Sequence, residues 1–190
     1  NTDDIKTQLS EAEKRVKRIE SEENISKGGT LFEEASEYRE ADEYDRALEA
    51  YEKAQAAYEE ALESASDSDI DLDTKSLKKT LVEIKANKQD IHYQRLRGEI
   101  DTLRSTFEQA ETLTEQKEFE KAQSVLEDLN SDITAVKDNA AGKGFDDLNE
   151  DLTTLQQSQQ DRLTYLTKKI ESNKELSSLR GKLGYVTRLI

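Results

Sequence analysis

Apolar residues recur along this chain at intervals of three and four, the spacing that gathers side chains on one face of an α-helix. The pattern predicts six helices, over residues 3–23, 30–41, 44–64, 73–114, 118–139 and 146–179. No run of alternating apolar and polar residues lies between turn residues, so no β-strand is expected. The predicted fold class is therefore all-α: an elongated antiparallel helical bundle or array with two helical hairpins and long helices.

The first predicted helix has the narrow apolar stripe of a coiled coil. Its apolar positions alternate between spacings of four and three, and they are Ile5, Leu9, Ala12, Val16 and Ile19. Residues 24–29, which end in two glycines, are expected to break the helical pattern. A tight turn is expected at residues 42–43, loops at 64–69 and 140–145, and a bend or close helix contact at Gly98.

Composition favours long helices over a compact globule. Only 33% of the residues are apolar and 37% are charged, which suffices when each helix buries a single stripe. Intrinsically disordered chains have a similar composition, but the absence of proline and the regular apolar spacing favour folded helices. Cysteine is absent, so no disulfide framework exists. Methionine is absent too, and we expect the chain to be a processed product or a piece of a longer one.

Two predicted hairpins share one template. Around the first turn, residues 43–47 read acid, aromatic, acid, base, alanine, and residues 118–122 repeat that order. Small residues are needed where two helix backbones approach, and a large ring fills the wedge beside the turn. The matching positions in the two hairpins are Ala35 and Ala110, Tyr38 and Leu113, Tyr44 and Phe119, Ala47 and Ala122, Tyr51 and Leu126, and Ala54 and Leu129. The two members of each pair are 75 residues apart, and we call this separation the repeat offset.

This template resembles the tetratricopeptide repeat, over residues 31–58 and more loosely over residues 104–129. The chain departs from that family where Leu31 replaces a tryptophan, Ala35 replaces a glycine and Glu59 replaces a closing proline. The repeat offset is also about twice that of the family, so the hairpins are not in direct tandem. One hairpin followed by a third helix, over residues 31–103, is similar to the MIT domain, a module that docks short helical peptides. Both resemblances imply binding and no catalysis.

The expected organisation has three segments. Residues 1–29 form an N-terminal coiled-coil-like helix, residues 30–103 form a first three-helix unit, and residues 104–190 form a second helical unit with a long C-terminal helix. No run of about 18 apolar residues is present, so no segment is expected to insert into a membrane. The compartment stays open, with the cytoplasm slightly favoured over an extracellular location.

Charge is strongly acidic and unevenly distributed. The net charge is −15, which disfavours nucleic acid as a partner because phosphate contact requires a basic face. Residues 31–73 hold 16 acidic and 3 basic residues, whereas residues 168–190 hold 6 basic and 2 acidic ones. The acidic hairpin is expected to attract either the basic C-terminal segment or an external basic helix. A halophilic source is a further, weaker interpretation of this acidity.

No set of residues for catalysis is recognisable, and neither an enzyme nor a cofactor or metal site is expected. His92 is the only histidine and has no cysteine or second histidine with which to bind zinc. Alternating aspartates over residues 67–73 lack the glycine and glutamate of a calcium-binding loop, and the last of them is expected to cap the next helix. These residues are Asp67, Asp69, Asp71 and Asp73.

The candidate partner-binding residues are Tyr38, Tyr44, Tyr51, Tyr58 and Glu52. Tyr44, Tyr51 and Tyr58 recur every seven residues and share one helix face, for which core packing and an open groove for a partner helix are the alternatives. The first hypothesis is a protein-interaction scaffold that binds a helix, a peptide or another copy of the chain. The second is a structural helical spacer or stalk within a larger assembly, surface-exposed or filamentous. An interaction module should leave a concave apolar patch exposed, and a spacer should leave none.

Overall fold

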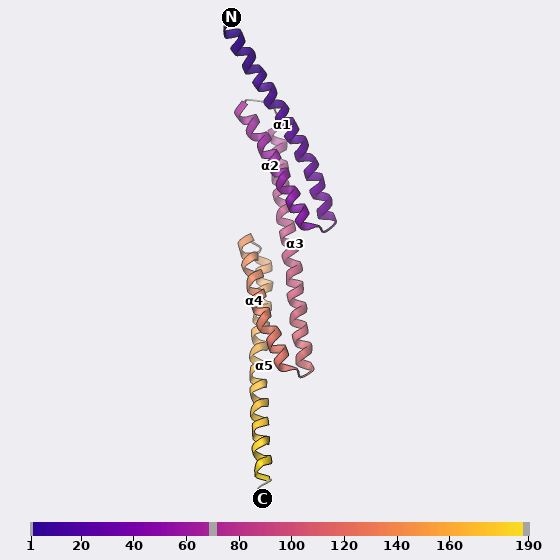
Figure 1. The fold of residues 1–190 in the computed structure, drawn as a ribbon, viewed down its shortest axis with the longest axis vertical. Helices are drawn as coiled ribbons and strands as arrows, with labels where there is room; N and C mark the ends of the chain where they lie inside the picture. Colours follow the sequence, from indigo (N-terminus) through magenta and orange to yellow (C-terminus); the bar gives the residue numbers. More distant parts are fainter. Residues whose placement is uncertain (1, 69–71, 188–190) are drawn as a thin grey trace. The chain divides into compact units, whose positions relative to one another are not determined.

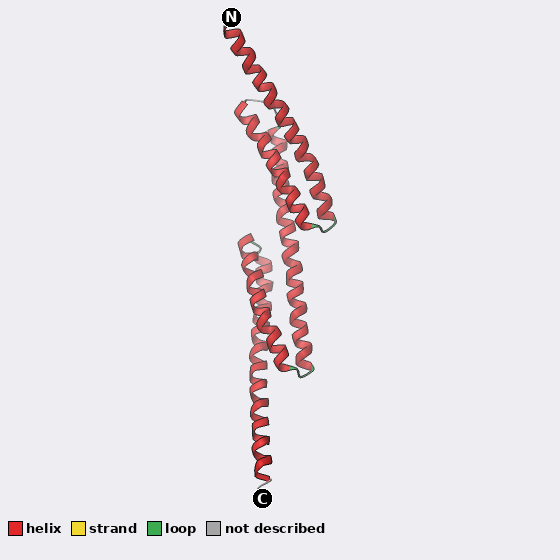
Figure 2. Cartoon of the chain, in the orientation of Figure 1, coloured by secondary structure: helices red, strands yellow, loops and turns green. Residues whose placement is uncertain are grey.

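The computed structural model describes residues 2–68 and 72–187, and those residues form five helices and no strand (Figures 1 and 2). The helices are α1, Thr2–Glu40; α2, Tyr44–Ser68; α3, Thr74–Glu115; α4, Phe119–Lys143; and α5, Asp146–Thr187. The predicted all-α helical array is confirmed. Three helices run past their predicted ends: α2 continues to Ser68 instead of residue 64, α4 to Lys143 instead of residue 139, and α5 to Thr187 instead of residue 179. The loops predicted at residues 64–69 and 140–145 are therefore helical over residues 64–68 and 140–143.

The chain divides into two compact units, Asn1–Tyr93 and Gln94–Ile190, which we call unit 1 and unit 2. The division falls inside α3, so each unit uses a different part of this helix. The second half of α1, α2 and the first part of α3 form the core of unit 1. The rest of α3 joins α4 and α5 in unit 2. The sequence predicts segment boundaries after residues 29 and 103. The division between the two units falls instead between Tyr93 and Gln94.

Both hairpin turns end their first helix in the same way. Asp42 and Lys117, which are one repeat offset apart, have positive φ angles of 58° and 64° that reverse the chain after a helix. The next amide then bonds back into the last helical turn: Glu43 N–H donates to the Tyr38 carbonyl at 2.9 Å, and the equivalent bond in the second turn also measures 2.9 Å. The tight turn predicted at residues 42–43 is confirmed, and residues 117–118 repeat it.

Small residues stand beside each turn, where the paired helices begin to run together. The alanines at these positions have no exposed surface in either unit. They are Ala35 and Ala47 in unit 1 and Ala110 and Ala122 in unit 2. The rings that open the second helix of each hairpin, Tyr44 and Phe119, are partly buried, and Tyr44 packs against the core of unit 1. The antiparallel pairing that the template predicts is therefore formed in both units.

The predicted break at residues 24–29 is wrong, because α1 continues through both glycines to Glu40. Gly28 is buried against the ring of Tyr58, and a Cβ atom at Gly28 would lie 3.1 Å from that ring. Glycine at this helical position therefore makes room for a large side chain on α2. This contact offsets the cost of glycine inside a helix, which is about 1 kcal/mol relative to alanine.

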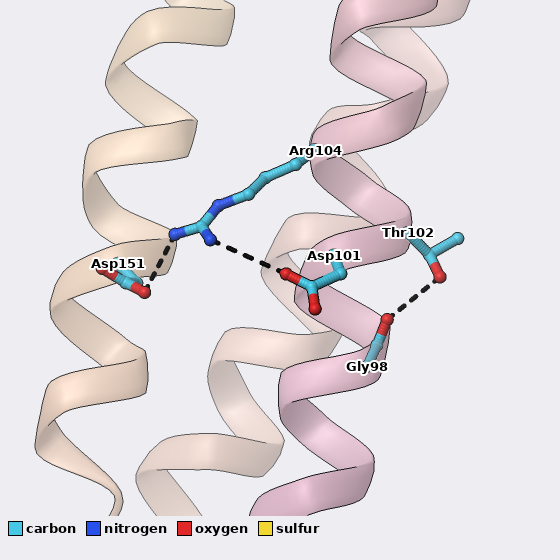
Figure 3. A network of polar contacts seen from close by, with 5 residues as sticks. All are labelled: Gly98, Asp101, Thr102, Arg104 and Asp151. Atoms are coloured by element: carbon cyan, nitrogen blue, oxygen red, sulfur yellow. Dashed lines mark hydrogen bonds and ion pairs between the residues drawn. The ribbon is translucent and has the colours of Figure 1, made fainter.

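Of the two alternatives expected at Gly98, a bend or a close helix contact, the close contact is wrong, because a Cβ atom at Gly98 would meet nothing within 4 Å. The helix α3 continues through this residue. The Gly98 carbonyl accepts a hydrogen bond from the Thr102 hydroxyl at 3.0 Å (Figure 3). Nearby, Arg104 pairs with Asp101 on its own helix at 3.7 Å and with Asp151 on α5 at 2.9 Å. The second of these ion pairs joins α3 to α5 within unit 2.

Buried positions recur at the repeat offset, which relates unit 2 to unit 1. The pairs of positions that are buried in both units include Tyr51 and Leu126, Tyr58 and Ile133, Leu77 and Leu152, Ile84 and Gln159, and Ile91 and Leu166. The side chains differ while their place in the core stays the same. Gly28 and Tyr58 correspond to Leu103 and Ile133, so a small residue packed on a large ring becomes two residues of medium size.

This exchange of sizes predicts the outcome of a double-mutant cycle. Gly28→Leu alone should lower the free energy of unfolding by about 2 kcal/mol, since the new side chain collides with Tyr58. Gly28→Leu combined with Tyr58→Ile, the pair that unit 2 uses, should recover about half of that loss or more. Chemical denaturation followed by circular dichroism measures both, and Tyr58→Ile alone completes the cycle. Strictly additive effects would contradict the equivalence of the two pairs.

Candidate interaction surface

The predicted partner-binding tyrosines are divided between the core and the surface of unit 1. Tyr51 and Tyr58 are buried, with 0% and 7% of their surface exposed, whereas Tyr38 and Tyr44 are partly buried. The Tyr51 ring meets the Phe32 ring edge to face, with centroids 5.7 Å apart. All four tyrosines belong to the unit 1 core or pack against it. The seven-residue spacing of this stripe therefore serves packing within unit 1.

A polar network joins all three helices of unit 1 around the Tyr51 hydroxyl. Asn87 Nδ2 on α3 donates to this hydroxyl at 3.1 Å, and Ser36 Oγ on α1 lies 3.2 Å from it. Arg39 Nη1 donates to Asn87 Oδ1 at 2.8 Å, so both ends of the amide are bonded. Because a buried polar group is costly to leave without a partner, this network favours one register of the three helices.

Sequence reasoning missed this network, although one signal for it is present. Asn87 lies in the apolar stripe of α3 between the buried Ile84 and Ile91, a place where a polar side chain needs a partner. Its partner Arg39 is far away in the sequence, on α1, and no local spacing connects the two. The sequence thus marks the position of a polar contact and leaves its other members unidentified.

Unit 2 links the same two positions with different chemistry. Ser36 and Asn87 correspond, one repeat offset further on, to Glu111 and Arg162. Glu111 on α3 and Arg162 on α5 form an ion pair, with 40% and 32% of their side-chain surfaces exposed. A pair with this much exposure contributes about 0–1 kcal/mol to the stability of unit 2.

Charged neighbours engage Tyr38 and Tyr44 beside the first turn. The Arg46 guanidinium lies 4.0 Å from the centre of the Tyr38 ring and donates to its hydroxyl at 2.9 Å. Arg46 also forms an ion pair with Glu43. The Tyr44 hydroxyl donates to Asp42 Oδ1 at 2.9 Å, and this bond raises the pKa of Tyr44 because it favours the protonated form. These contacts cover the outer edge of the predicted stripe.

The three basic residues of the acidic segment 31–73 are all engaged within unit 1. Arg39 bonds to Asn87 and Arg46 pairs with Glu43, as described above. Lys53 pairs with Glu49 at 2.7 Å, and this bond lowers the pKa of Glu49 and raises the pKa of Lys53. In the basic C-terminal segment, residues 171–183 of α5 are exposed, and residues 188–190 lie outside the described residues.

Two grooves flank α2 in unit 1. The first, of about 390 Å³, lies between α1 and α2. Its lining residues are Lys17, Glu20, Glu23, Asn24, Glu60, Glu63 and Ser64. The second, of about 580 Å³, lies between α2 and α3 and places the apolar Leu81 and Val82 beside Lys85 and Lys88. Glu52, which is predicted to bind a partner, is exposed and pairs with Lys88 at 3.5 Å.

Candidate metal ligands are dispersed. His92 lines the second groove and is partly buried. Within residues 2–68 and 72–187, no group of three or more His, Cys, Asp or Glu residues is arranged to hold a metal ion. Asp69 and Asp71 of the aspartate-rich stretch lie outside the described residues. Asp73 caps α3 as predicted, since Ser76 N–H donates to Asp73 Oδ1 at 3.0 Å.

No family model matches this chain, and neither curated proteins nor solved structures give a significant match. Among the described helices, none has an apolar stretch long enough to cross a bilayer.

Loss of the Tyr51 hydroxyl should destabilise unit 1. Tyr51→Phe leaves the Asn87 amide without one acceptor, and we expect a loss of about 1–2 kcal/mol in the free energy of unfolding. Tyr44→Phe is the matched control, because it removes the same atom from an exposed hydrogen bond; its effect should stay within about 0.5 kcal/mol. Chemical denaturation measures both variants. Equal effects would argue against the network as a stabilising element.

Tyr58 should make unit 1 sensitive to alkaline pH. Burial, together with the nearby Glu33, raises the pKa of Tyr58. The folded state therefore holds this proton more tightly than the unfolded state, whose tyrosines titrate at about 10. The stability that this difference contributes is present below about pH 10 and is lost as the pH rises further. Between about pH 9 and about pH 11, wild type should lose more stability than Tyr58→Phe, and identical losses would refute the effect.

Proposed function

We propose that the chain is a non-enzymatic structural segment, a helical spacer made of repeated three-helix units within a larger assembly. The observation that carries this proposal is the recurrence of buried positions at the repeat offset, as from Tyr51 to Leu126 and from Ile91 to Leu166. Units that repeat in this way are stabilised by their own cores and by their immediate neighbours, so such a protein gains length by repetition. A spacer needs this property, whereas an enzyme needs a site of convergent reactive groups.

The packing of the tyrosine stripe supports a spacer over a peptide-binding hairpin. A binding groove would present a concave apolar surface, but Tyr51 and Tyr58 lie in the core, and Arg46 lies over the Tyr38 ring. The large apolar residues that are exposed in unit 1 lie elsewhere, on the first half of α1 and on α3. They are Ile5, Leu9, Val16, Ile19 and Val82.

The resemblance to tetratricopeptide repeats and to the MIT domain enters this proposal at the level of the hairpin alone. The buried alanines and the shared turn support it there. The long repeat offset and the third helix of each unit set the chain apart from hairpins stacked directly in tandem. What we carry over from the two families is a non-catalytic helical scaffold.

A second candidate is a protein-interaction scaffold that binds a basic helix or peptide, or another copy of the chain. The charge of unit 1 favours it: residues 31–73 hold 16 acidic and 3 basic residues. Each of those basic residues already has a contact within the unit, and the groove between α1 and α2 is lined by four glutamates. A basic partner would associate faster because of this field, and added salt would weaken the effect.

Lengthening the chain by one unit tests the proposed spacer. A second copy of residues 19–93 is inserted directly after Tyr93, so that the copy continues α3 in register. We expect the longer chain to be as helical per residue as the parent, and the contour length released on unfolding under force to grow by that of the inserted segment. Circular dichroism and optical tweezers measure these quantities.

The matched control carries Tyr51→Asp in the inserted copy only. This change places an unpaired charge in the core of the added unit, so the copy should not fold while both parent units still do. An inserted copy that is unfolded even without this substitution would show that the units cannot be repeated, and the spacer proposal would fail.

A further inference from the structure

The first half of α1 carries an apolar stripe at the surface. Ile5, Leu9 and Val16 are 66%, 60% and 53% exposed, although they lie on the helix whose second half forms part of the unit 1 core. Single exposed apolar residues are common on proteins, but three at spacings of four and seven form one continuous helix face. This face lies roughly a third of a helical turn around α1 from the buried residues Ser21, Gly28 and Ala35, so the packing of unit 1 does not cover it.

The stripe matches the third helix of both units. Leu9 and Val16 lie one repeat offset before two residues of α3 and two repeat offsets before two residues of α5. All four of those residues are fully buried. Leu9 corresponds to Ile84 and Gln159, and Val16 corresponds to Ile91 and Leu166. Ile5 corresponds to the buried Leu155 in unit 2 and to the partly buried Thr80 in unit 1. In unit 1, Ile84 and Ile91 pack against the first two helices, which form the hairpin.

We infer that the first half of α1 serves as the third helix of a further unit of this kind, and that a two-helix hairpin of such a unit occupies its apolar face. The inference rests on the proposed function, because it extends the same repeat. The partner is an antiparallel hairpin with an apolar face complementary to Ile5, Leu9 and Val16.

One position restricts which hairpin fits best. The residue that is Asn87 in unit 1 and Arg162 in unit 2 is Ala12 in the first half of α1. A hairpin of the unit 1 type would lose the bond from Asn87 to the buried Tyr51 hydroxyl. A hairpin of the unit 2 type has Leu126 at that place, so it leaves no buried hydroxyl without its donor and gives up the partly exposed ion pair of Glu111 instead.

The test supplies the unit 2 hairpin in register. A copy of residues 94–150 is added directly ahead of Asn1 in the full chain, so that Leu9 takes the place of Gln159. We expect the added segment to be as helical as the parent chain. Amides of residues 5–16 should exchange with solvent about tenfold more slowly than in the parent chain, or slower still. Circular dichroism and hydrogen exchange provide the two readouts.

Two variants of the fused chain are matched controls. Leu9→Glu with Val16→Glu places two charges on the proposed face and should abolish the added protection. Val82→Glu places a charge at an apolar residue of α3 that is 69% exposed, and it should leave the protection unchanged. All three residues lie at the surface of the parent chain, so none of these changes should unfold units 1 and 2.

Three results would overturn the inference. The first is an added hairpin that stays unfolded, and the second is protection of residues 5–16 that does not change. The third is association of the unfused chain with itself that Leu9→Glu with Val16→Glu abolishes, because a second copy would then occupy the face. If the inserted unit of the preceding test folds and this added hairpin does not, the inference fails and the spacer proposal stands.

Discussion

Close approach of antiparallel helices over small residues is the contact on which the rest of this structure depends. With only 33% apolar residues, the chain cannot surround its helices with large side chains. The fully buried alanines beside each turn let the two backbones meet, so that a few large residues complete each core. The left-handed residues Asp42 and Lys117 direct the second helix back along the first, so the turns and the alanines act together.

The sequence predicts the hairpins well and their surroundings less well, for a physical reason. Local spacing determines the turn at residues 42–43 and the burial of the alanines beside it. The break predicted at residues 24–29 follows from the low helix propensity of glycine, yet Gly28 is used for its small size against Tyr58. The partners of Tyr51 lie on helices far away in the sequence. Contacts of that kind depend on tertiary packing, which no local pattern encodes.

The two units keep one geometry and vary its chemistry. Unit 1 buries the Tyr51 hydroxyl, which accepts a hydrogen bond from Asn87. Unit 2 instead buries Gln159, whose Nε2 donates to the Leu126 carbonyl at 2.7 Å. Where unit 1 packs two leucines against its core, unit 2 has a hydrogen bond of 3.2 Å between side chains. The leucines are Leu62 and Leu81, and the bonded residues are Lys137 and Gln156. Each of these donors finds its acceptor within its own unit, because a buried donor without an acceptor is costly.

Gly28 and Tyr58 of unit 1 differ in size from Leu103 and Ile133, which hold the same two positions in unit 2. This difference in size discourages a helix of one unit from pairing with a helix of the other. Proteins built of like repeats commonly misassemble by pairing an element with the wrong copy. If α2 paired with the helix that carries Leu103, Tyr58 would collide with that leucine, and if α4 paired with α1, Ile133 would leave a void against Gly28. Such a mismatch penalises cross-pairing between repeats. Divergence of the repeats therefore steers each helix to its own neighbours while the chain collapses.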